Sequence, residues 1–161
     1  MEKNALKTAM KTSISEVLET MFFLPLEFSE SITRDELLGS EKQDTFMSKV
    51  RFSGPMGGCF VLYVPGDAAR AITSSFLGRA DEDVSEEDIE GTVKEIINMI
   101  AGSTFYNYDD QAVFSLGIPE VVNPVELEIN ELHGEKAIFI AIEIPGNHLA
   151  LEMVMGEPNS T

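Results

Sequence analysis

Residues 85–103 read SEEDIEGTVKEIINMIAGS, and this stretch decides the fold because it predicts one amphipathic helix over 85–102. Ser85 is a favourable N-cap, and Asp88, three residues further on, gives the spacing of a capping box. Acidic residues fill the first turn, where the helix dipole favours negative charge. Gly102 is expected to end the helix, because glycine is favoured just beyond a helix C-terminus.

The two faces of this helix differ in chemistry. Glu95 and Asn98 stand three residues apart on the polar side, so they are neighbours on the helix surface. Gly91 and Gly102 share that side, where each costs the helix roughly 1 kcal/mol but leaves room for the backbone of another molecule. The opposite stripe is aliphatic and is expected to face a core: Ile89, Val93, Ile96, Ile97 and Ile100.

A carboxylate beside a carboxamide on a bare surface can hold a cation and orient a water molecule. The alternative is that Glu95 and Asn98 are ordinary solvated residues, as such pairs are on most amphipathic helices. In sequence, Glu95, Asn98 and Gly102 give the pattern E-x-x-N-x-x-x-G. This pattern resembles the signature of the chemotaxis phosphatases CheX and CheC, and the resemblance covers most of the chain, closest to the CheX branch. Gly91 and Val121 depart from the family pattern, which often has Asp or Ser at the first position and Pro near the second.

The resemblance implies an enzyme that hydrolyses the phospho-aspartate of a CheY-like response regulator. By analogy, Asn98 would orient the attacking water and Glu95 would pair with a lysine of the regulator. Gly91 and Gly102 would be partner-docking positions, where the helix lies close to the regulator. No metal or cofactor would belong to this chain, since the Mg²⁺ is expected on the partner. CheX-like proteins dimerise, so a homodimer is expected.

Two other functions stay open at this point. The chain could be a non-catalytic module that binds a phosphorylated receiver, as a relative of the flagellar-switch proteins. It could also be a dimerisation scaffold in which exposed strand edges at 125–132 or 149–155 pair between chains. Residues 106–110, YNYDD, combine aromatic and acidic side chains, and they could flank a docking surface or form an ordinary loop.

Composition narrows the class of partner. The chain has 161 residues, 43% of them hydrophobic, which suits one domain over 1–161. Its net charge of −17 argues against nucleic acid or an anionic membrane as partner and is compatible with a surface that presents Lys or Arg. The longest apolar run, 137–142, is too short to cross a membrane, and the N-terminus lacks the pattern of a leader. We therefore expect a cytoplasmic protein.

Cysteine and histidine give little support for other chemistry. Cys59 is the single cysteine and is expected to be a buried apolar residue. His133 falls in a predicted turn, and no spacing of His and Cys matches a zinc site.

An α+β fold is predicted, built from duplicated helix-plus-antiparallel-strand units that form a mainly antiparallel sheet flanked by helices. Residues 4–23 are a helix with a stripe of Met10, Ile14, Val17, Leu18 and Met21, and 103–110 either prolong the central helix or bend away from it. The remaining elements are a short edge strand at 26–32, a loop at 33–44, a helix over 67–77, and strands at 46–52, 59–64, 114–118, 125–132, 137–144 and 149–155.

The sequence pattern of 1–80 recurs over 81–161 with an offset of 79 residues, which predicts an internal duplication. Two alignments of the halves are possible. In the first, the hairpin connection at 52–60 aligns with that at 144–149; in the second, Val64-Pro65-Gly66 aligns with 144–146. At this offset Glu16 and Glu19 occupy the positions of Glu95 and Asn98, and bulkier residues replace both glycines. Because a second carboxylate would repel a phosphoryl group, the first helix is expected to be structural and the second to carry the site.

Overall fold

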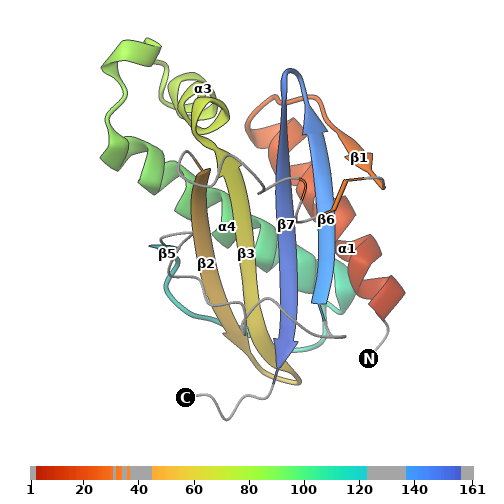
Figure 1. The fold of residues 1–161 in the computed structure, drawn as a ribbon. Coiled ribbons are helices and arrows are strands. Elements are labelled where there is room, and N and C mark those ends of the chain that lie inside the picture. Colours follow the sequence, from red (N-terminus) through yellow and green to blue (C-terminus); the bar gives the residue numbers. More distant parts are fainter. Residues whose placement is uncertain (1–2, 31, 34–35, 37–44, 123–136, 157–161) are drawn as a thin grey trace.

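A computed structural model of the chain describes residues 3–30, 32–33, 36, 45–122 and 137–156. Among these residues, seven strands form one sheet in the order β1-β6-β7-β3-β2-β4, with β5 also paired to β2, and every pair is antiparallel (Figure 1). The strands are β1 (Glu27–Ser29), β2 (Thr45–Ser53), β3 (Gly57–Pro65), β4 (Ser115–Leu116), β5 (Glu120–Val122), β6 (Ala137–Ile144) and β7 (Asn147–Gly156).

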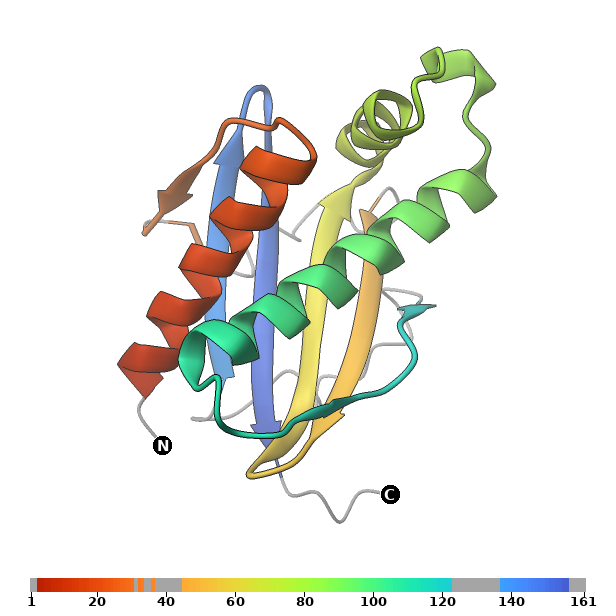
Figure 2. The same cartoon turned by 180° about the vertical axis from the view of Figure 1, so that it is seen from behind.

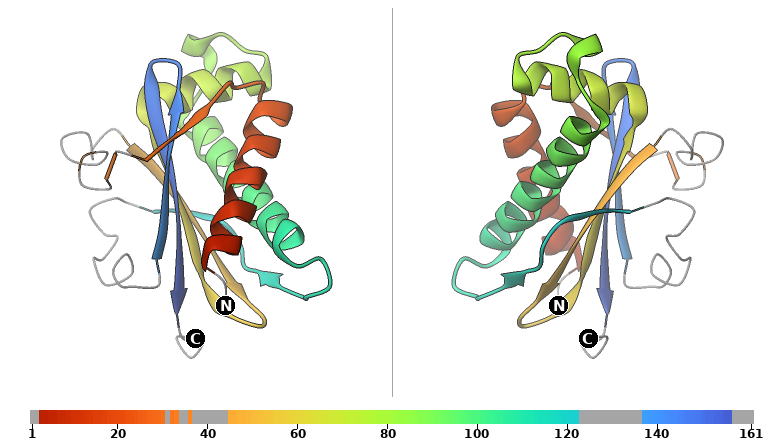
Figure 3. Two further views of the ribbon diagram at one scale, coloured as in Figure 1. Left: turned by 90° about the vertical axis from the view of Figure 1, so that its right-hand side faces the viewer. Right: turned by 90° about the vertical axis from the view of Figure 1, so that its left-hand side faces the viewer.

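The helices lie on one face of this sheet (Figure 3). α4 crosses that face diagonally, with α1 along its C-terminal half and α3 near its N-terminal end (Figure 2). The helical elements are α1 (Lys3–Ser15), the π-helical turn η1 (Glu16–Met21), α3 (Gly66–Leu77), the 3₁₀ turn η3 (Asp81–Asp83) and α4 (Glu86–Tyr108). The arrangement confirms the predicted α+β class with an antiparallel sheet flanked by helices.

The main core fills the space between the helices and the sheet. It takes alternate residues of each central strand, such as Phe60 and Leu62 of β3 and Leu149 and Leu151 of β7, all 0% exposed. Full burial of a side chain of this size stabilises the fold by about 1.5–3 kcal/mol relative to exposure. Because α1 and α4 share this core, the sheet fixes the face that each helix turns outward.

The centre of the second face of the sheet is buried as well, which the sequence pattern did not predict. A smaller apolar cluster of Met47, Cys59, Val61, Tyr63 and Ala150 lies there. Glu152 of β7 is 0% exposed on this face and accepts a hydrogen bond of 3.0 Å from the Tyr63 hydroxyl. Burial of Cys59 is confirmed. The predicted exposed edge at 149–155 is wrong, since β7 is paired on both sides, to β6 and to β3.

The first helix differs from prediction in its last turns. It is α-helical only to Ser15 and continues as the π-helical η1. The wider i→i+5 winding rotates Met21 off the buried stripe, where a regular helix would place it, and Met21 is 50% exposed. Phe23 follows with φ of 53°, a left-handed conformation that is rare for an aromatic residue.

Most of the other predicted elements are present. β1 confirms a short strand at the sheet edge, and β2, β3, β6 and α3 fall where they were expected. The strand predicted at 114–118 is reduced to β4, and β5 was not foreseen. The predicted strand at 125–132 and the turn with His133 lie outside the described residues, as does most of the loop at 33–44.

The doubled pattern and the single domain over 1–161 stay predictions. The β2–β3 and β6–β7 connections both join antiparallel neighbours, whereas Pro65 leads directly into α3. This observation favours the alignment of hairpin with hairpin over the alternative that pairs Val64-Pro65-Gly66 with 144–146.

Candidate functional site

The start of α4 is fixed by local hydrogen bonds. The Ser85 Oγ accepts from the Asp88 N–H and Asp88 Oδ2 accepts from the Ser85 N–H, both at 3.0 Å, which confirms the predicted capping box. Hydrogen bonding from the Ser85 backbone, above all, lowers the pKa of the Asp88 carboxyl. Asp88 also pairs with Arg79 at 3.0 Å, and Arg70 donates to the Val84 carbonyl at 2.8 Å. The chain therefore enters α4 in one defined direction.

α4 continues past Gly102 to Tyr108, so the expected end at Gly102 is wrong, and of the two alternatives for 103–110 the structure shows a prolonged helix. Gly102 is not among the glycines with positive φ, so it sits inside the helix. Ala101, directly before Gly102, and Phe105, beyond it, continue the buried stripe at 0% and 5% exposure. Their burial outweighs the glycine penalty of roughly 1 kcal/mol. The helix ends where the Asp109 N–H donates to the Phe105 carbonyl at 2.9 Å.

The rotation of α4 about its axis is set by its buried side. The Ser48 hydroxyl of β2, itself 0% exposed, donates to the Val93 carbonyl at 3.0 Å and ties the middle of the helix to the sheet. The predicted apolar stripe is confirmed, with exposures of 1% or less for Ile89, Val93, Ile96, Ile97 and Ile100. The opposite face is therefore held outward.

Four predicted site residues lie together on this outward side, which we call the α4 outer face: Gly91, Glu95, Asn98 and Gly102. Gly91, Glu95 and Gly102 are exposed and Asn98 is half-buried. Within the described part of the chain, no hydrogen bond or ion pair engages the side chain of Glu95 or Asn98. Both functional groups are thus available to another molecule.

The two glycines have no packing role among the residues that the structure describes. A Cβ added at Gly91 would meet no heavy atom of the described structure within 4 Å. A Cβ at Gly102 would meet Leu116 Cδ1 at 3.9 Å, an ordinary van der Waals distance. Since alanine would fit at both positions and favour the helix, nothing inside the fold explains glycine there.

The first helix uses its matching carboxylate for packing. Glu16 Oε1 accepts from the Ser103 hydroxyl at 3.1 Å and from Asn107 Nδ2 at 3.2 Å, across the contact between η1 and α4. Asn107 also donates to the Ser13 hydroxyl at 2.9 Å. Glu16 therefore helps to hold the two helices together. This role fits the expectation that the first helix is structural. Ser103 and Asn107 were not predicted to have a role, although their i, i+4 spacing beside the buried stripe indicates a helix contact.

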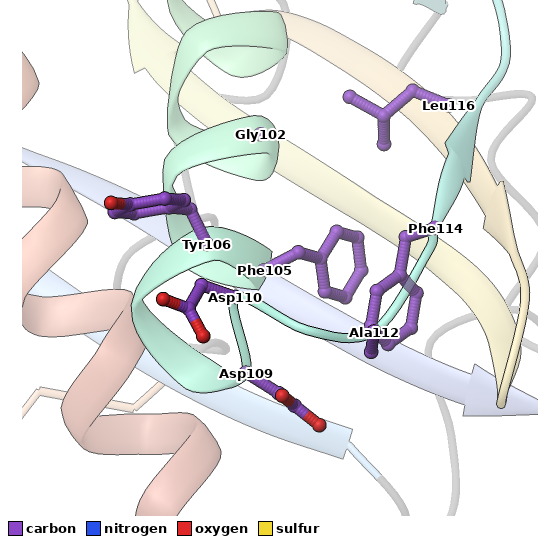
Figure 4. Close-up of a pocket in the computed structure, with 8 residues that line it drawn as sticks. All are labelled: Gly102, Phe105, Tyr106, Asp109, Asp110, Ala112, Phe114 and Leu116. Atoms are coloured by element: carbon purple, nitrogen blue, oxygen red, sulfur yellow. The ribbon is translucent and has the colours of Figure 1, made fainter.

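A pocket of about 210 Å³ opens at the C-terminal end of the α4 outer face (Figure 4). Phe105 of α4 stacks on Phe114 with ring centroids 3.9 Å apart and planes at 6°. The lining residues are Gly102, Phe105, Tyr106, Asp109, Asp110, Ala112, Phe114 and Leu116. The predicted aromatic and acidic cluster at 106–110 thus contributes three side chains to a pocket beside the site.

The described residues contain neither a metal-binding cluster nor a membrane-spanning helix. Among them, His, Cys, Asp and Glu side chains form no group of three or more that could hold a metal ion. None of the helices in the described ranges combines the length and the hydropathy needed to cross a bilayer.

Comparisons with known proteins identify the family and the fold. The model of the family "Chemotaxis phosphatase CheX" matches residues 46–143, which include all of α4. A search of curated protein sequences gave no significant match.

Several solved structures share the fold. CheX of Vibrio vulnificus has 19% identity and a TM-score of 0.74, with 94% of this chain and 96% of that chain covered. CheX of Borrelia burgdorferi, solved as a CheX-CheY-BeF3-Mg²⁺ complex, has 17% identity and a TM-score of 0.72, with 94% and 97% covered. Thermotoga maritima FliY is less similar, with 14% identity, a TM-score of 0.64, and 97% and 92% covered. With its family model matched over most of the sequence and its fold shared with CheX structures, the chain belongs to the CheX family of chemotaxis phosphatases.

Proposed function

We propose that this protein accelerates hydrolysis of the aspartyl phosphate on a CheY-like response regulator in chemotaxis signalling. The observation that carries the proposal is the α4 outer face, where an unengaged carboxylate and an unengaged carboxamide lie between two glycines that the fold itself does not need. Family membership and the complex of Borrelia CheX with CheY, BeF3 and Mg²⁺ support the same partner.

Asn98 is the proposed catalytic residue. Hydrolysis requires water to attack phosphorus in line while the bond from phosphorus to the aspartate oxygen breaks, giving a free aspartate and inorganic phosphate, which takes up the proton of the water. Phosphoryl transfer depends mostly on positioning and electrostatics. A carboxamide can accept from and donate to the attacking water, and its neutrality avoids repulsion by the phosphoryl oxygens.

Glu95 is the proposed docking residue. It is exposed and lies one helical turn from Asn98, so a lysine of the regulator can reach its carboxylate while the phosphoryl group lies at Asn98. Gly91 and Gly102 would let the regulator's backbone come close to α4. The Mg²⁺ that balances the phosphoryl charge would be held by the regulator.

The test measures phosphate loss from the host's own phosphorylated single-domain receivers. We expect acceleration by the wild type, and a loss of roughly a hundredfold or more in the rate constant for Asn98→Ala at saturating protein, with binding largely kept. Glu95→Ala should weaken both binding and hydrolysis. Glu19→Ala is the matched control, because Glu19 is the exposed residue of the first helix that aligns with Asn98.

Full activity of Asn98→Ala would contradict the mechanism. Binding of phosphorylated receivers without faster phosphate loss would instead identify a non-catalytic binding module. We also propose that the protein works as a homodimer in the cytoplasm. Sedimentation of the purified protein tests the dimer.

A further inference from the structure

The pocket beside the α4 outer face is continuous with the proposed docking surface. Gly102 belongs to both, and it stands one turn from Asn98, about 6 Å along the helix axis. Tyr106 follows one turn later and is 69% exposed. A regulator domain that covers Asn98 therefore also covers the mouth of this pocket.

The pocket combines an apolar wall with an acidic end. Phe105 points from α4 towards Phe114, and the carboxylates of Asp109 and Asp110 lie at the end away from Leu116 (Figure 4). Aromatic contacts hold this wall in place. The Phe105 and Phe114 rings are stacked, and the Phe105 ring packs edge-on against Phe52 with ring centroids 4.9 Å apart.

The two carboxylates keep acceptor capacity. Asp109 Oδ1 accepts from the Gln111 N–H at 3.1 Å, and Asp110 Oδ1 accepts from Gln111 Nε2 at 3.3 Å. Their Oδ2 atoms take part in no hydrogen bond or ion pair among the described residues. Gln111 thus links the two acids at the pocket's end and leaves one oxygen of each free to accept from a partner.

This combination selects one kind of occupant. An anionic group would be repelled by Asp109 and Asp110, and a purely apolar side chain would remove both carboxylates from water without compensation. Arginine and lysine have an apolar stem that can lie along Phe105 and Phe114 and a cationic head that can reach the acids. The exposed ring of Tyr106 offers a further cation–π contact. The volume of about 210 Å³ suits one such side chain.

We propose that this pocket receives an arginine or lysine side chain of the docked response regulator and thereby helps to decide which regulators bind. The inference rests on the proposed function, since it places the regulator on the α4 outer face. The two parts of the surface then have different roles. Glu95 and Asn98 act next to the phosphoryl group, while Asp109 and Asp110 contribute only affinity and partner choice.

The experiment compares Asp109→Asn/Asp110→Asn with the control Asp81→Asn/Asp83→Asn. Both double variants are nearly isosteric, both remove two negative charges, and the control charges lie on the exposed turn η3. Binding is measured against a regulator carrying Mg²⁺ and BeF3 as the phosphoryl analogue, and hydrolysis at saturating regulator. We expect Asp109→Asn/Asp110→Asn to raise Kd roughly three- to tenfold at low salt, less at high salt, with an unchanged rate constant.

A charge exchange identifies the occupant. Asp110→Lys should weaken binding further, and a regulator in which one surface Lys or Arg is changed to Glu should recover affinity with Asp110→Lys but not with the wild type. A Kd within twofold of the control for Asp109→Asn/Asp110→Asn, while the wild type hydrolyses its regulator, would overturn the pocket proposal alone. So would a lower rate constant at saturation with unchanged Kd. Absence of both binding and hydrolysis in the wild type would overturn the proposed function instead.

Discussion

Gly91→Ala and Gly102→Ala should stabilise the isolated protein and weaken its binding to the regulator. Stability and affinity should move in opposite directions, because both positions lie inside α4 with no contact that requires glycine.

The magnitude of the stabilisation follows from helix propensity and open space. Alanine is better than glycine inside a helix by about 0.5–1 kcal/mol, partly because it restricts the unfolded chain. The two positions are about 16 Å apart along the axis, so the effects should add to about 1–2 kcal/mol. For a chain of 161 residues this corresponds to a rise in Tm of roughly 2–8 °C.

Binding should respond in the opposite direction, since the added methyl groups face the regulator. If the regulator's backbone approaches α4 at van der Waals distance, each methyl forces a shift that costs about 1–3 kcal/mol, or roughly 5- to 150-fold in Kd. The assay combines urea denaturation of the free protein with titration of the regulator carrying BeF3 and Mg²⁺.

Gly78→Ala serves as the control for the direction of the stability effect. Gly78 also has open space around its α-carbon, but its φ is 68°, so alanine there should lower stability by about 1 kcal/mol. If Gly91→Ala lowered stability as Gly78→Ala does, the space at Gly91 would not be open in solution. If both helix variants bound the regulator as tightly as the wild type, the α4 outer face would not be the docking surface.

Other residues test the parts that hold the site in place. Ile97→Ala should lower the free energy of unfolding by about 2–5 kcal/mol, because Ile97 is fully buried beneath the site, and urea denaturation measures this. Asn107→Ala should cost about 1 kcal/mol through lost hydrogen bonds to Ser13 and Glu16, with hydrolysis at saturating regulator unchanged; a large fall in that rate would contradict a structural role. The pKa of Asp88 is lowered in the folded state, so its contribution to stability is present above its unfolded pKa of about 4 and is lost as the pH falls through the folded value. Thermal melts between neutral and acidic pH should show this loss in the wild type and not in Asp88→Asn.

What the sequence by itself determined about this protein is local. The capping box at Ser85 and Asp88 depends on residues three apart, and the buried and exposed sides of α4 follow from the helical period. The candidate pair Glu95 and Asn98 could be found for the same reason, because their proximity needs no information beyond the helix that carries them.

Tertiary structure decided the features that depend on distant partners. Gly102 is a plausible helix end in sequence, but burial of Phe105 against Phe52 and Phe60 of the sheet carries α4 onward to Tyr108. In sequence, Glu152 lies on the polar side of an alternating strand, where exposure is expected. It is buried because both faces of the sheet are packed at its centre.

The pocket is also a tertiary feature, since its two sides come from separate elements. Leu116 reaches the side of α4 because β4 pairs with β2, with Leu116 opposite Phe52. Gly102 and Tyr106 lie in the last turns of α4, and Asp109 is the C-cap that follows it. Periodicity and capping act over one or two turns, whereas burial and strand register are set by residues far apart in the chain. The sequence could therefore indicate the face that carries the chemistry, and only the fold could place an acidic pocket beside it.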